Sequence, residues 1–377
     1  MIPFNKPYLH GRELVYIAQS VASGKISGDG IFTKKCHSFF EEKYGIKKAL
    51  LTTSCTDALE MCALLLNIQQ DDEVILPAFT FVSTANAFAL RGAKLMFADS
   101  CKDSPNIDPE EIKRLITPKT KAIVVVHYAG IACDMDAITA IAKQYDIPII
   151  EDAAQAIDSY YKGIPLGTIG RFATFSFHET KNVISGEGGL LALNDFNDVL
   201  KAEIIREKGT NRSSFFRGEV DKYGWVDLGS SFLPSDIIAA YLYAQLEVLK
   251  EIQERRLWIW NFYDTFLKDE VNHENIFRIC EVPNYATNNA HMYYLVCRDI
   301  ETRTRLISYL KLNGVQAVFH YLSLNSSPYF SQFGKVSELE NSNRYTNCLV
   351  RLPLFYELQE EDLFLICRLL KQFCVEN

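Results

Sequence analysis

Between Lys48 and Asp195, short apolar runs alternate with segments of helical periodicity, and this alternation restricts the fold more than any other feature of the chain. The runs are rich in Val, Ile, Leu and Phe and are short, so we expect strands at EVILPAF, KLMFAD, KAIVVVHYAG, IPIIED, ATFSFH and GLLALN. Intervening segments such as DALEMCALLLNI and MDAITAIAKQYD predict helices. The alternation predicts an α/β core with helices on both faces of one sheet.

A second, smaller unit is expected after this core. The stretch from Ser235 to Leu267 contains no Gly or Pro, and Ser235 is a favourable N-cap, so a long helix is predicted there. Beyond it, AHMYYLVCRD, TRTRLISYLKLNG, VQAVFHY and EEDLFLICRLLKQF predict strand, helix, strand and helix. We therefore expect a large α/β domain over residues 1–250 and a small α+β domain over residues 251–377.

The overall charge favours small-molecule chemistry. Lys and Arg number 39 against 47 Asp and Glu, for a formal net charge of −8, which disfavours a nucleic-acid surface. The ten cysteines form no C-x-x-C pair and no spacing typical of a metal site, so we expect reduced thiols, a reducing compartment and no metal. The N-terminus does not resemble a signal peptide, and the apolar runs are too short to cross a bilayer. A cytoplasmic protein that contacts no membrane is expected.

Lys181 lies between the strand-like ATFSFH and the glycine-rich SGEGG. A lysine chosen at random is most often a solvated surface residue. Here an apolar strand and flexible backbone surround the side chain, a setting in which the amine loses water and its pKa falls. Such a lysine is suited to forming a Schiff base with a carbonyl compound.

Glu151 and Asp152 end the apolar strand IPIIED, and small residues follow them. An isolated acidic pair in this position most often caps the next turn. The functional alternative is that Asp152 holds a cationic ring nitrogen, with Gln155 beside the same ligand.

Two further segments could contact a phosphorylated ring compound. LTTSCTDALEMCALLL passes from a strand-like run through Ser54 and Thr56 into a helix, whose free N–H groups favour an anion; plain N-capping explains these residues equally well. In PAFTFVSTANA, Phe81 follows a strand end, where it either stacks on a flat ring or packs in the core. Taken together, a lysine, a carboxylate, an aromatic ring and a phosphate-accepting helix start are what pyridoxal phosphate requires.

A series of motifs occurs in order along nearly the whole chain: MIPFNKP, SGKISGDG, LTTSCTDALEM, PAFTFVSTANAF, HYAGIACDMD, EDAAQA, FSFHETKN, IREKGTNRS and FHY. Through them the chain resembles the DegT/DnrJ/EryC1/StrS sugar aminotransferases. Within that family it is most similar to the transaminases that form dTDP-4-amino-4,6-dideoxygalactose for enterobacterial surface polysaccharides such as lipopolysaccharide O-antigen and enterobacterial common antigen. The resemblance implies the type I fold of pyridoxal-phosphate enzymes, as in aspartate aminotransferase, with a mixed, mostly parallel sheet and a smaller C-terminal α+β domain.

The resemblance also implies roles for individual residues around pyridoxal 5'-phosphate. Lys181 would bind the cofactor covalently, and Asp152 would pair with its ring nitrogen. The remaining cofactor contacts implied are Gln155 at the ring hydroxyl, Phe81 on the ring face, and Thr56, Asp57 and Ser176 at the phosphate, the contacts of Thr56 and Asp57 being made through their backbone N–H groups.

Substrate and partner contacts are implied in the same way. Lys25, His320 and Tyr321 would bind the substrate, although the family's HYxPLH pattern is HYLSLN here, with Asn325 where a second histidine is usual. In many members a residue of the partner subunit reaches the phosphate from the stretch before the long helix. That stretch is LGSSFLPSD here and offers Ser231, or alternatively its neighbour Ser230. A homodimer with shared active sites is therefore expected.

The implied reaction is transfer of an amino group from L-glutamate to a dTDP-4-keto-6-deoxyhexose, with a galacto product. HYAG resembles the branch that aminates carbon 4, whereas relatives acting on the 3-keto sugar commonly carry HLYG; the 3-keto sugar stays the alternative substrate. A sugar dehydratase is disfavoured because that branch has a histidine in place of Lys181. A non-catalytic regulatory homologue is disfavoured by the intact set of Lys181, Asp152 and Ser176.

Overall fold

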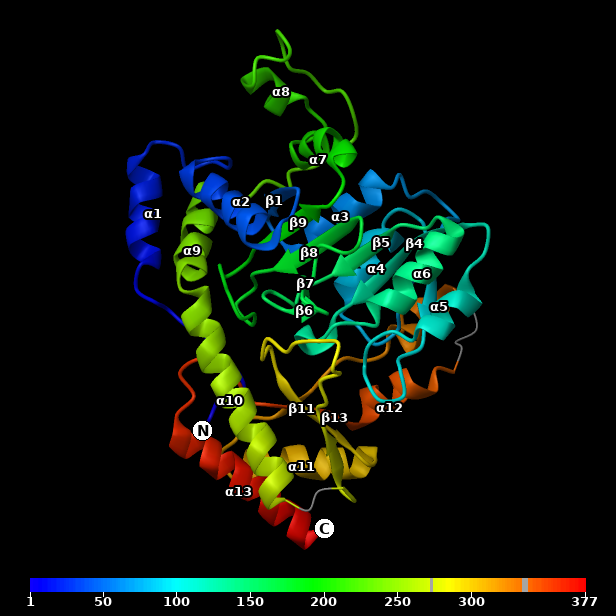
Figure 1. Ribbon diagram of the computed structural model, residues 1–377, viewed down its shortest axis with the longest axis vertical. Helices are drawn as coiled ribbons and strands as arrows, with labels where there is room; N and C mark the ends of the chain where they lie inside the picture. The colour runs from blue at the N-terminus through cyan, green and yellow to red at the C-terminus, as the bar shows by residue number, and fades with distance from the viewer. Residues whose placement is uncertain (272–273, 334–337) are drawn as a thin grey trace.

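A sheet of seven strands lies at the centre of the larger part of the molecule in the computed structural model, which describes residues 1–271, 274–333 and 338–377 (Figure 1). β9 runs antiparallel to both of its neighbours, and the other adjacent strands are parallel. The predicted mixed, mostly parallel sheet is confirmed. Its spatial order is β1 (Lys48–Thr52), β9 (Gly189–Leu193), β8 (Phe172–Ser176), β5 (Ile149–Asp152), β4 (Thr120–Val126), β2 (Glu73–Pro77) and β3 (Lys94–Ala98).

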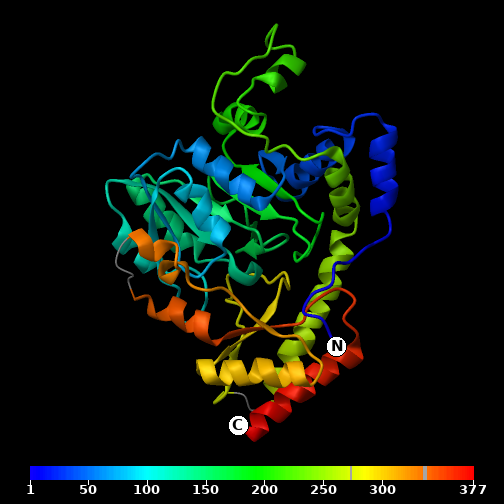
Figure 2. The same ribbon diagram turned by 180° about the vertical axis from the view of Figure 1, so that it is seen from behind.

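Alternate side chains of these strands pack in two different hydrophobic cores, one on each face of the sheet. In β4, Ile123 and Val125 belong to the core on one face, and Ala122 and Val124 belong to the core on the other. The period of two follows from the pleat, and coverage of both faces explains why the strand is apolar throughout. The first core is closed by α2 (Ile31–Tyr44), α5 (Pro109–Leu115), α6 (Met135–Tyr145) and α9 (Asp236–Glu247), and the second by α3 (Cys55–Leu65), α4 (Val82–Ala89) and α7 (Val199–Arg206). Views from opposite sides therefore show different helices in front of the sheet (Figures 1 and 2).

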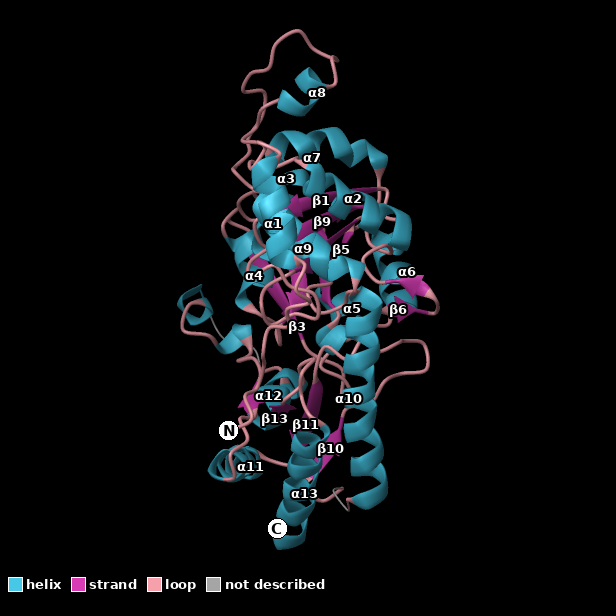
Figure 3. Ribbon diagram, turned by 90° about the vertical axis from the view of Figure 1, so that its left-hand side faces the viewer, coloured by secondary structure: helices cyan, strands magenta, loops and turns pink. Residues whose placement is uncertain are grey.

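A smaller antiparallel sheet lies at the other end of the molecule, beside the long helix α10 (Leu249–Glu270) (Figures 1 and 3). Among the described residues it has the order β10 (Phe277–Ile279), β11 (Tyr293–Cys297), β13 (Leu349–Leu352) and β12 (Val318–Phe319). Its helices are α11 (Ile300–Leu312), α12 (Glu340–Cys348) and α13 (Glu360–Glu376). This unit confirms the predicted α+β character of the C-terminal part, although the strand expected over VQAVFHY is reduced to β12.

The prediction of a single long helix from Ser235 onward is wrong in one respect. Ser235 does cap α9, since its hydroxyl accepts a hydrogen bond from the Ile238 N–H. At Val248, however, the backbone leaves the helical region (φ −112°, ψ 17°), and α10 starts afresh at Leu249. No Gly or Pro marks this break, so the sequence gives no local signal for it. The domain boundary near residue 250 stays a prediction; it is supported by α10 side chains such as Ile259 that pack in the core of the small sheet.

Several segments lie outside these layers. α1 (Glu13–Ala22) packs against α9, and β6 (Tyr160–Tyr161) with β7 (Ile164–Pro165) forms a small hairpin. α8 (Arg212–Phe216) and the loop that follows it project away from the body of the molecule (Figures 1 and 3). The short 3-10 turns are Tyr128–Gly130, Phe196–Asp198, Leu324–Ser326 and Phe330–Phe333. Within the three described ranges, no helix combines the length and the apolar character that crossing a bilayer demands.

Candidate active site

A cavity of about 580 Å³ lies between the main sheet and the C-terminal unit. Its walls include the last residues of β5 and β8, the starts of α3 and α4, and Arg351 of β13. The carboxyl ends of parallel strands are where α/β proteins place their ligands, and this volume is in the range of small-molecule sites. The sequence-predicted residues that line it are Thr56, Phe81, Asp152, Gln155, Ser176, Lys181, His320 and Tyr321.

Lys181 lies in the turn between β8 and β9, where its backbone N–H donates to the His178 carbonyl at 2.9 Å. Burial of the side chain lowers the pKa of Lys181, and the negative charge of Asp152 opposes this shift. A lowered pKa increases the fraction of neutral amine at physiological pH, and the neutral amine is the nucleophilic form. The predicted environment of Lys181 is thus present in the structure.

Asp152 is the last residue of β5, and both of its carboxylate oxygens are held. Oδ2 accepts a hydrogen bond from the Thr84 hydroxyl at 2.7 Å, and Oδ1 accepts one from the Ala154 N–H at 3.2 Å. Burial raises the pKa of Asp152, while these two hydrogen bonds and the nearby Lys181 act to lower it. A buried carboxylate of this kind favours a cationic partner, because such a partner would offset the cost of desolvation.

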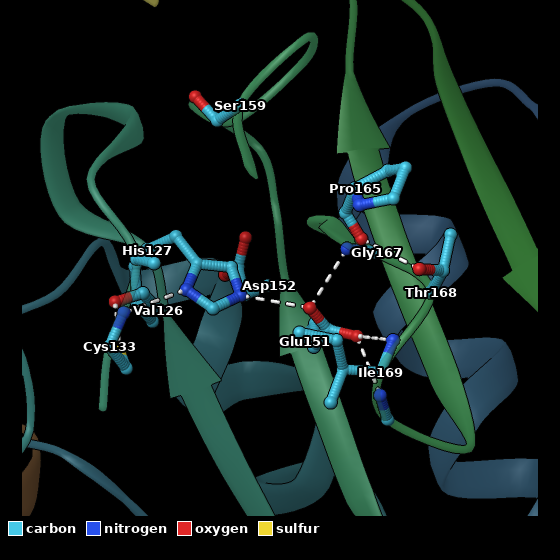
Figure 4. Close-up of polar contacts among 12 residues, drawn as sticks. Val126, His127, Cys133, Glu151, Asp152, Ser159, Pro165, Gly167, Thr168 and Ile169 are labelled. Carbon is cyan, nitrogen blue, oxygen red and sulfur yellow. Dashed lines mark hydrogen bonds and ion pairs between the residues drawn. The ribbon is translucent and has the colours of Figure 1, made fainter. Parts of the chain in front are cut away.

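The preceding residue, Glu151, belongs to a buried network of its own (Figure 4). His127 contacts the Glu151 Oε2 through Nε2 at 3.0 Å, and the His127 Nδ1 accepts from the Cys133 N–H at 3.2 Å. Since Nδ1 accepts, the ring proton lies on Nε2, which donates to Glu151. Burial acts to raise the pKa of Glu151, but the hydrogen bond from His127 and backbone N–H groups outweigh it, so the pKa lies below its ordinary value.

The start of α3 faces the same cavity. The Ser54 side chain caps the helix by accepting from the Asp57 N–H at 3.0 Å, and Asp57 accepts in turn from the Thr53 hydroxyl. The Asp57 N–H expected at a phosphate therefore has a partner already, which leaves the N–H groups of Cys55 and Thr56 at the helix start. A Cβ on Gly189 would lie 2.3 Å from the Ser54 carbonyl carbon, so only glycine lets β9 approach the helix this closely.

Phe81, Gln155 and Ser176 line the cavity at three different strand ends. Phe81 precedes α4 and is 56% exposed, so its ring is available to a ligand rather than packed in the core. Ser176 is the last residue of β8. Gln155 is already engaged, since its Oε1 accepts from the Ala129 N–H at 2.6 Å and its Nε2 donates to the Tyr321 hydroxyl at 3.0 Å.

His320 and Tyr321 form a further part of the cavity wall. Their rings stack with centroids 3.5 Å apart, and the His320 Nδ1 lies 2.8 Å from the Tyr128 hydroxyl oxygen. Burial, together with the positive charge of Arg351, holds the pKa of His320 well below its ordinary value. Asn325, by contrast, does not line the cavity, and its side chain accepts from the Ser323 hydroxyl at 2.8 Å.

Asp57 is next to Thr56 but is not among the residues that line the cavity, and two further predicted residues lie away from it within one chain. Lys25 lines a separate cavity of about 260 Å³ together with Arg206 and Arg217. Ser231 forms an isolated bridge with Glu207 in the segment that follows α8. Their predicted roles toward substrate and phosphate stay predictions.

A sequence profile of the DegT/DnrJ/EryC1/StrS aminotransferase family matches residues 7–371. The chain belongs to this family. The Bacillus subtilis spore coat polysaccharide biosynthesis protein SpsC is 30% identical to it over 96% of this chain and 94% of SpsC. The aminotransferase TlmJ of Streptoalloteichus hindustanus is 28% identical, with a TM-score of 0.91, over 100% of this chain and 99% of TlmJ.

Spr1654 of Streptococcus pneumoniae, assigned as a sugar aminotransferase and solved in a PLP-form, is 25% identical with a TM-score of 0.91, over 100% of this chain and 99% of Spr1654. The family, the type I fold and pyridoxal 5'-phosphate as the cofactor of the family are thereby confirmed. The identity of the substrate is a separate question.

Sequence reasoning missed several residues that line the cavity of this DegT/DnrJ/EryC1/StrS member, among them Thr84, His291 and Arg351. Thr84 lies in the quoted PAFTFVSTANA segment, but nothing in that segment ties it to Asp152. Arg351 had a usable signal, because it is the one charged residue in the apolar run CLVRLPLF. A lone charge in a buried strand requires a partner or a ligand.

Proposed function

We propose that this protein is a pyridoxal-phosphate-dependent aminotransferase that moves the amino group of L-glutamate to carbon 4 of a dTDP-4-keto-6-deoxyhexose, giving a dTDP-4-amino-4,6-dideoxyhexose of galacto configuration. The observation that carries the proposal is the common cavity in which Lys181 and Asp152 lie, with the amine shifted toward its neutral form and the carboxylate buried. An aminotransferase needs a nucleophilic amine and a fixed negative charge in one site.

The residues present fit the cofactor. Asp152 offers a buried carboxylate to the ring nitrogen, Phe81 offers an exposed ring face, and Ser176 with the open N–H groups of Cys55 and Thr56 offers donors to a phosphate. Pyridoxal phosphate, when bound, supplies an aldehyde that condenses with amines and a ring that withdraws electrons from the adjacent carbon.

The chain's own residues then carry the proton transfers. Once the amino donor has displaced it, the Lys181 Nζ is free to take the proton from the donor's Cα, and in the second half-reaction to deliver a proton to carbon 4 of the sugar. Asp152 holds its charge at the ring nitrogen, in an orientation fixed by Thr84 and Ala154. The stacked rings of His320 and Tyr321 line the same cavity, where they occupy space that water would otherwise fill.

The choice of the 4-keto sugar is supported by HYAG, whose residues His127–Gly130 lie directly after β4; the 3-keto sugar is the second candidate. A role in polysaccharide synthesis is supported by the similarity to SpsC, a spore coat polysaccharide biosynthesis protein. The test is to incubate the purified protein with glutamate and, separately, with dTDP-4-keto and dTDP-3-keto 6-deoxysugars. Amination of the 4-keto sugar is expected, and amination of the 3-keto sugar alone would overturn the choice.

We also propose that the protein acts as a homodimer. The projecting segment, which consists of α8 and the loop after it, carries the exposed aromatic side chains Phe216, Tyr223 and Trp225, of which Trp225 is 81% exposed. Exposed rings of this kind are typical of a contact surface. Sedimentation and activity measured over a dilution series test the proposal, and a fully active monomer at high dilution would exclude it.

A further inference from the structure

Arg351 presents an unpaired guanidinium group to the candidate active site. It lies on β13, in the interior of the small sheet, and lines the cavity. Its Nε is buried without a hydrogen-bond partner, and within residues 1–271, 274–333 and 338–377 it forms no ion pair with an acidic side chain. Its contact is with the ring of Phe4, whose centroid lies 4.6 Å from the guanidinium carbon.

A second arginine shows how this fold satisfies a buried guanidinium when the role is structural. Arg256 on α10 donates to the backbone carbonyls of Ala290, His291 and Leu354. Arg351 has no comparable set of acceptors among the described residues. Because an uncompensated charge in a partly buried site is costly, a group that is absent from the free protein is expected to complete it.

The position of Arg351 indicates which anion this is. Its charge acts on Lys181, where it adds to burial in lowering the pKa of the amine. An amino acid carries its carboxylate one carbon from the reacting amine, so a cation close to the reactive lysine is in place to receive that carboxylate. The reacting end of the proposed keto sugar is uncharged and offers no such anion. Burial lowers the pKa values of the two nearby histidines, His291 and His320, so their neutral forms are favoured and Arg351 is the better partner for a carboxylate.

We propose that Arg351 binds the α-carboxylate of the amino donor and of the keto acid formed from it. The planar guanidinium matches a carboxylate with two parallel hydrogen bonds, a geometry that a lysine cannot reproduce. The proposal rests on the proposed function, since it names a contact of the donor half-reaction. Arg351 then sets selectivity for a carboxylate-bearing amine in that half-reaction and binds no group of the sugar in the other.

The test compares Arg351→Gln and Arg351→Lys with Arg278→Gln, a control that removes an arginine from β10 of the same sheet, where it pairs with Asp103 at the surface. The half-reaction of the cofactor-loaded protein is followed by visible absorption with three donors: glutamate, glutamine, which keeps only the α-carboxylate, and isoglutamine, which keeps only the side-chain carboxylate. Arg351→Gln should weaken apparent binding of glutamate and glutamine about 100-fold, Arg351→Lys should recover part of this loss, and Arg278→Gln should match the unaltered protein. The reverse half-reaction with the dTDP-aminosugar should lose far less than the half-reaction with glutamate, because a change in the pKa of Lys181 acts on both, whereas only the amino acid carries the α-carboxylate.

Equal loss with the amino acids and with the aminosugar would overturn the proposal, because Arg351 would then support the site as a whole. If the Arg351 variants bound isoglutamine more weakly but bound glutamine normally, the proposal would be overturned as well, because Arg351 would then bind the side-chain carboxylate of the donor. Calorimetric binding of 2-oxoglutarate to the same proteins needs no turnover. If 2-oxoglutarate bound in a way that depends on Arg351 but no transamination occurred, the proposed function would be rejected and the carboxylate site would be retained. If Arg351→Gln and the unaltered protein bound 2-oxoglutarate equally well, the carboxylate site would be rejected.

Discussion

Glu151 and Asp152 are consecutive residues of β5, yet their carboxylates belong to different environments (Figure 4). The pleat directs neighbouring side chains to opposite faces of a sheet. Glu151 is held by His127 and by the N–H groups of Gly167, Ile169 and Gly170, and Asp152 faces the cavity that contains Lys181. One acidic dipeptide thus provides an anchor for the strand end and a charge for the site.

For Asp152 we expect a loss of turnover with retention of cofactor. Asp152→Asn keeps the shape of the side chain but removes the charge offered to the ring nitrogen, so kcat should fall about a thousandfold, or about 4 kcal/mol. Thr84→Val keeps the carboxylate and removes one of its hydrogen bonds, and should cost only about tenfold. Single-turnover absorbance with glutamate measures both. Near-normal turnover in Asp152→Asn would assign Asp152 to a turn-capping role.

For Glu151 we expect a loss of stability. Glu151→Gln places an NH₂ group opposite backbone N–H donors or opposite His127, so the free energy of unfolding of the apoprotein should fall by about 3 kcal/mol. Urea unfolding followed by circular dichroism checks this. Glu187→Gln, at an exposed side chain, is the matched control and should lie within 0.5 kcal/mol or so of the unaltered protein. If Glu151→Gln and Glu187→Gln had the same free energy of unfolding, the hydrogen-bond network of Glu151 would not contribute to stability.

The same network gives a pH dependence. Because the pKa of Glu151 is lower in the folded protein than in the unfolded chain, its contribution is complete above the unfolded value, near 4.3, and is lost as the pH falls through the folded value. The unfolding free energy of the unaltered protein should therefore drop more steeply on acidification than that of Glu151→Gln. Parallel curves from pH 6 to pH 3 would rule this out.

For Lys181 we expect titration below the ordinary lysine value. Burial lowers its pKa, Asp152 raises it, and Arg351 lowers it, so the midpoint should move down in Asp152→Asn and up in Arg351→Gln. The pH dependence of labelling of the apoprotein with an amine-reactive reagent, resolved by peptide mapping, gives these midpoints. The exposed Lys250 serves as an internal reference. Shifts of the opposite sign would show that the three side chains do not interact as the structure places them.

For Gly189 we expect a change in cofactor affinity. A Cβ there would lie 2.3 Å from backbone atoms of Ser54, so Gly189→Ala must displace the start of α3, where the phosphate is proposed to bind. Affinity for pyridoxal phosphate, measured by absorbance titration, should fall at least about tenfold, or about 1.4 kcal/mol. Gly224→Ala, at a position with open space around it, should leave the affinity unchanged.

The strands and the first site residues were accessible from the sequence because they follow from local patterns. Apolar runs, an acidic pair at a strand end and a lysine before a glycine-rich turn are all contained in short windows. The break at Val248, the Thr84 contact to Asp152 and the place of Arg351 depend on packing between distant segments. Local propensity carries no information about such contacts, and a single chain gives none about a partner, which is why Lys25 and Ser231 stay assigned by resemblance alone.

The place of β13 in the chain has a consequence for how the protein is made. The main sheet is complete once β9 has been translated, so a chain still attached to the ribosome can already assemble the strand ends that carry Asp152 and Ser176. The strand that carries Arg351 lies between β11 and β12 and emerges only near the end of synthesis. A product released early by a premature stop codon before Leu349 would therefore retain the reactive lysine and lack Arg351.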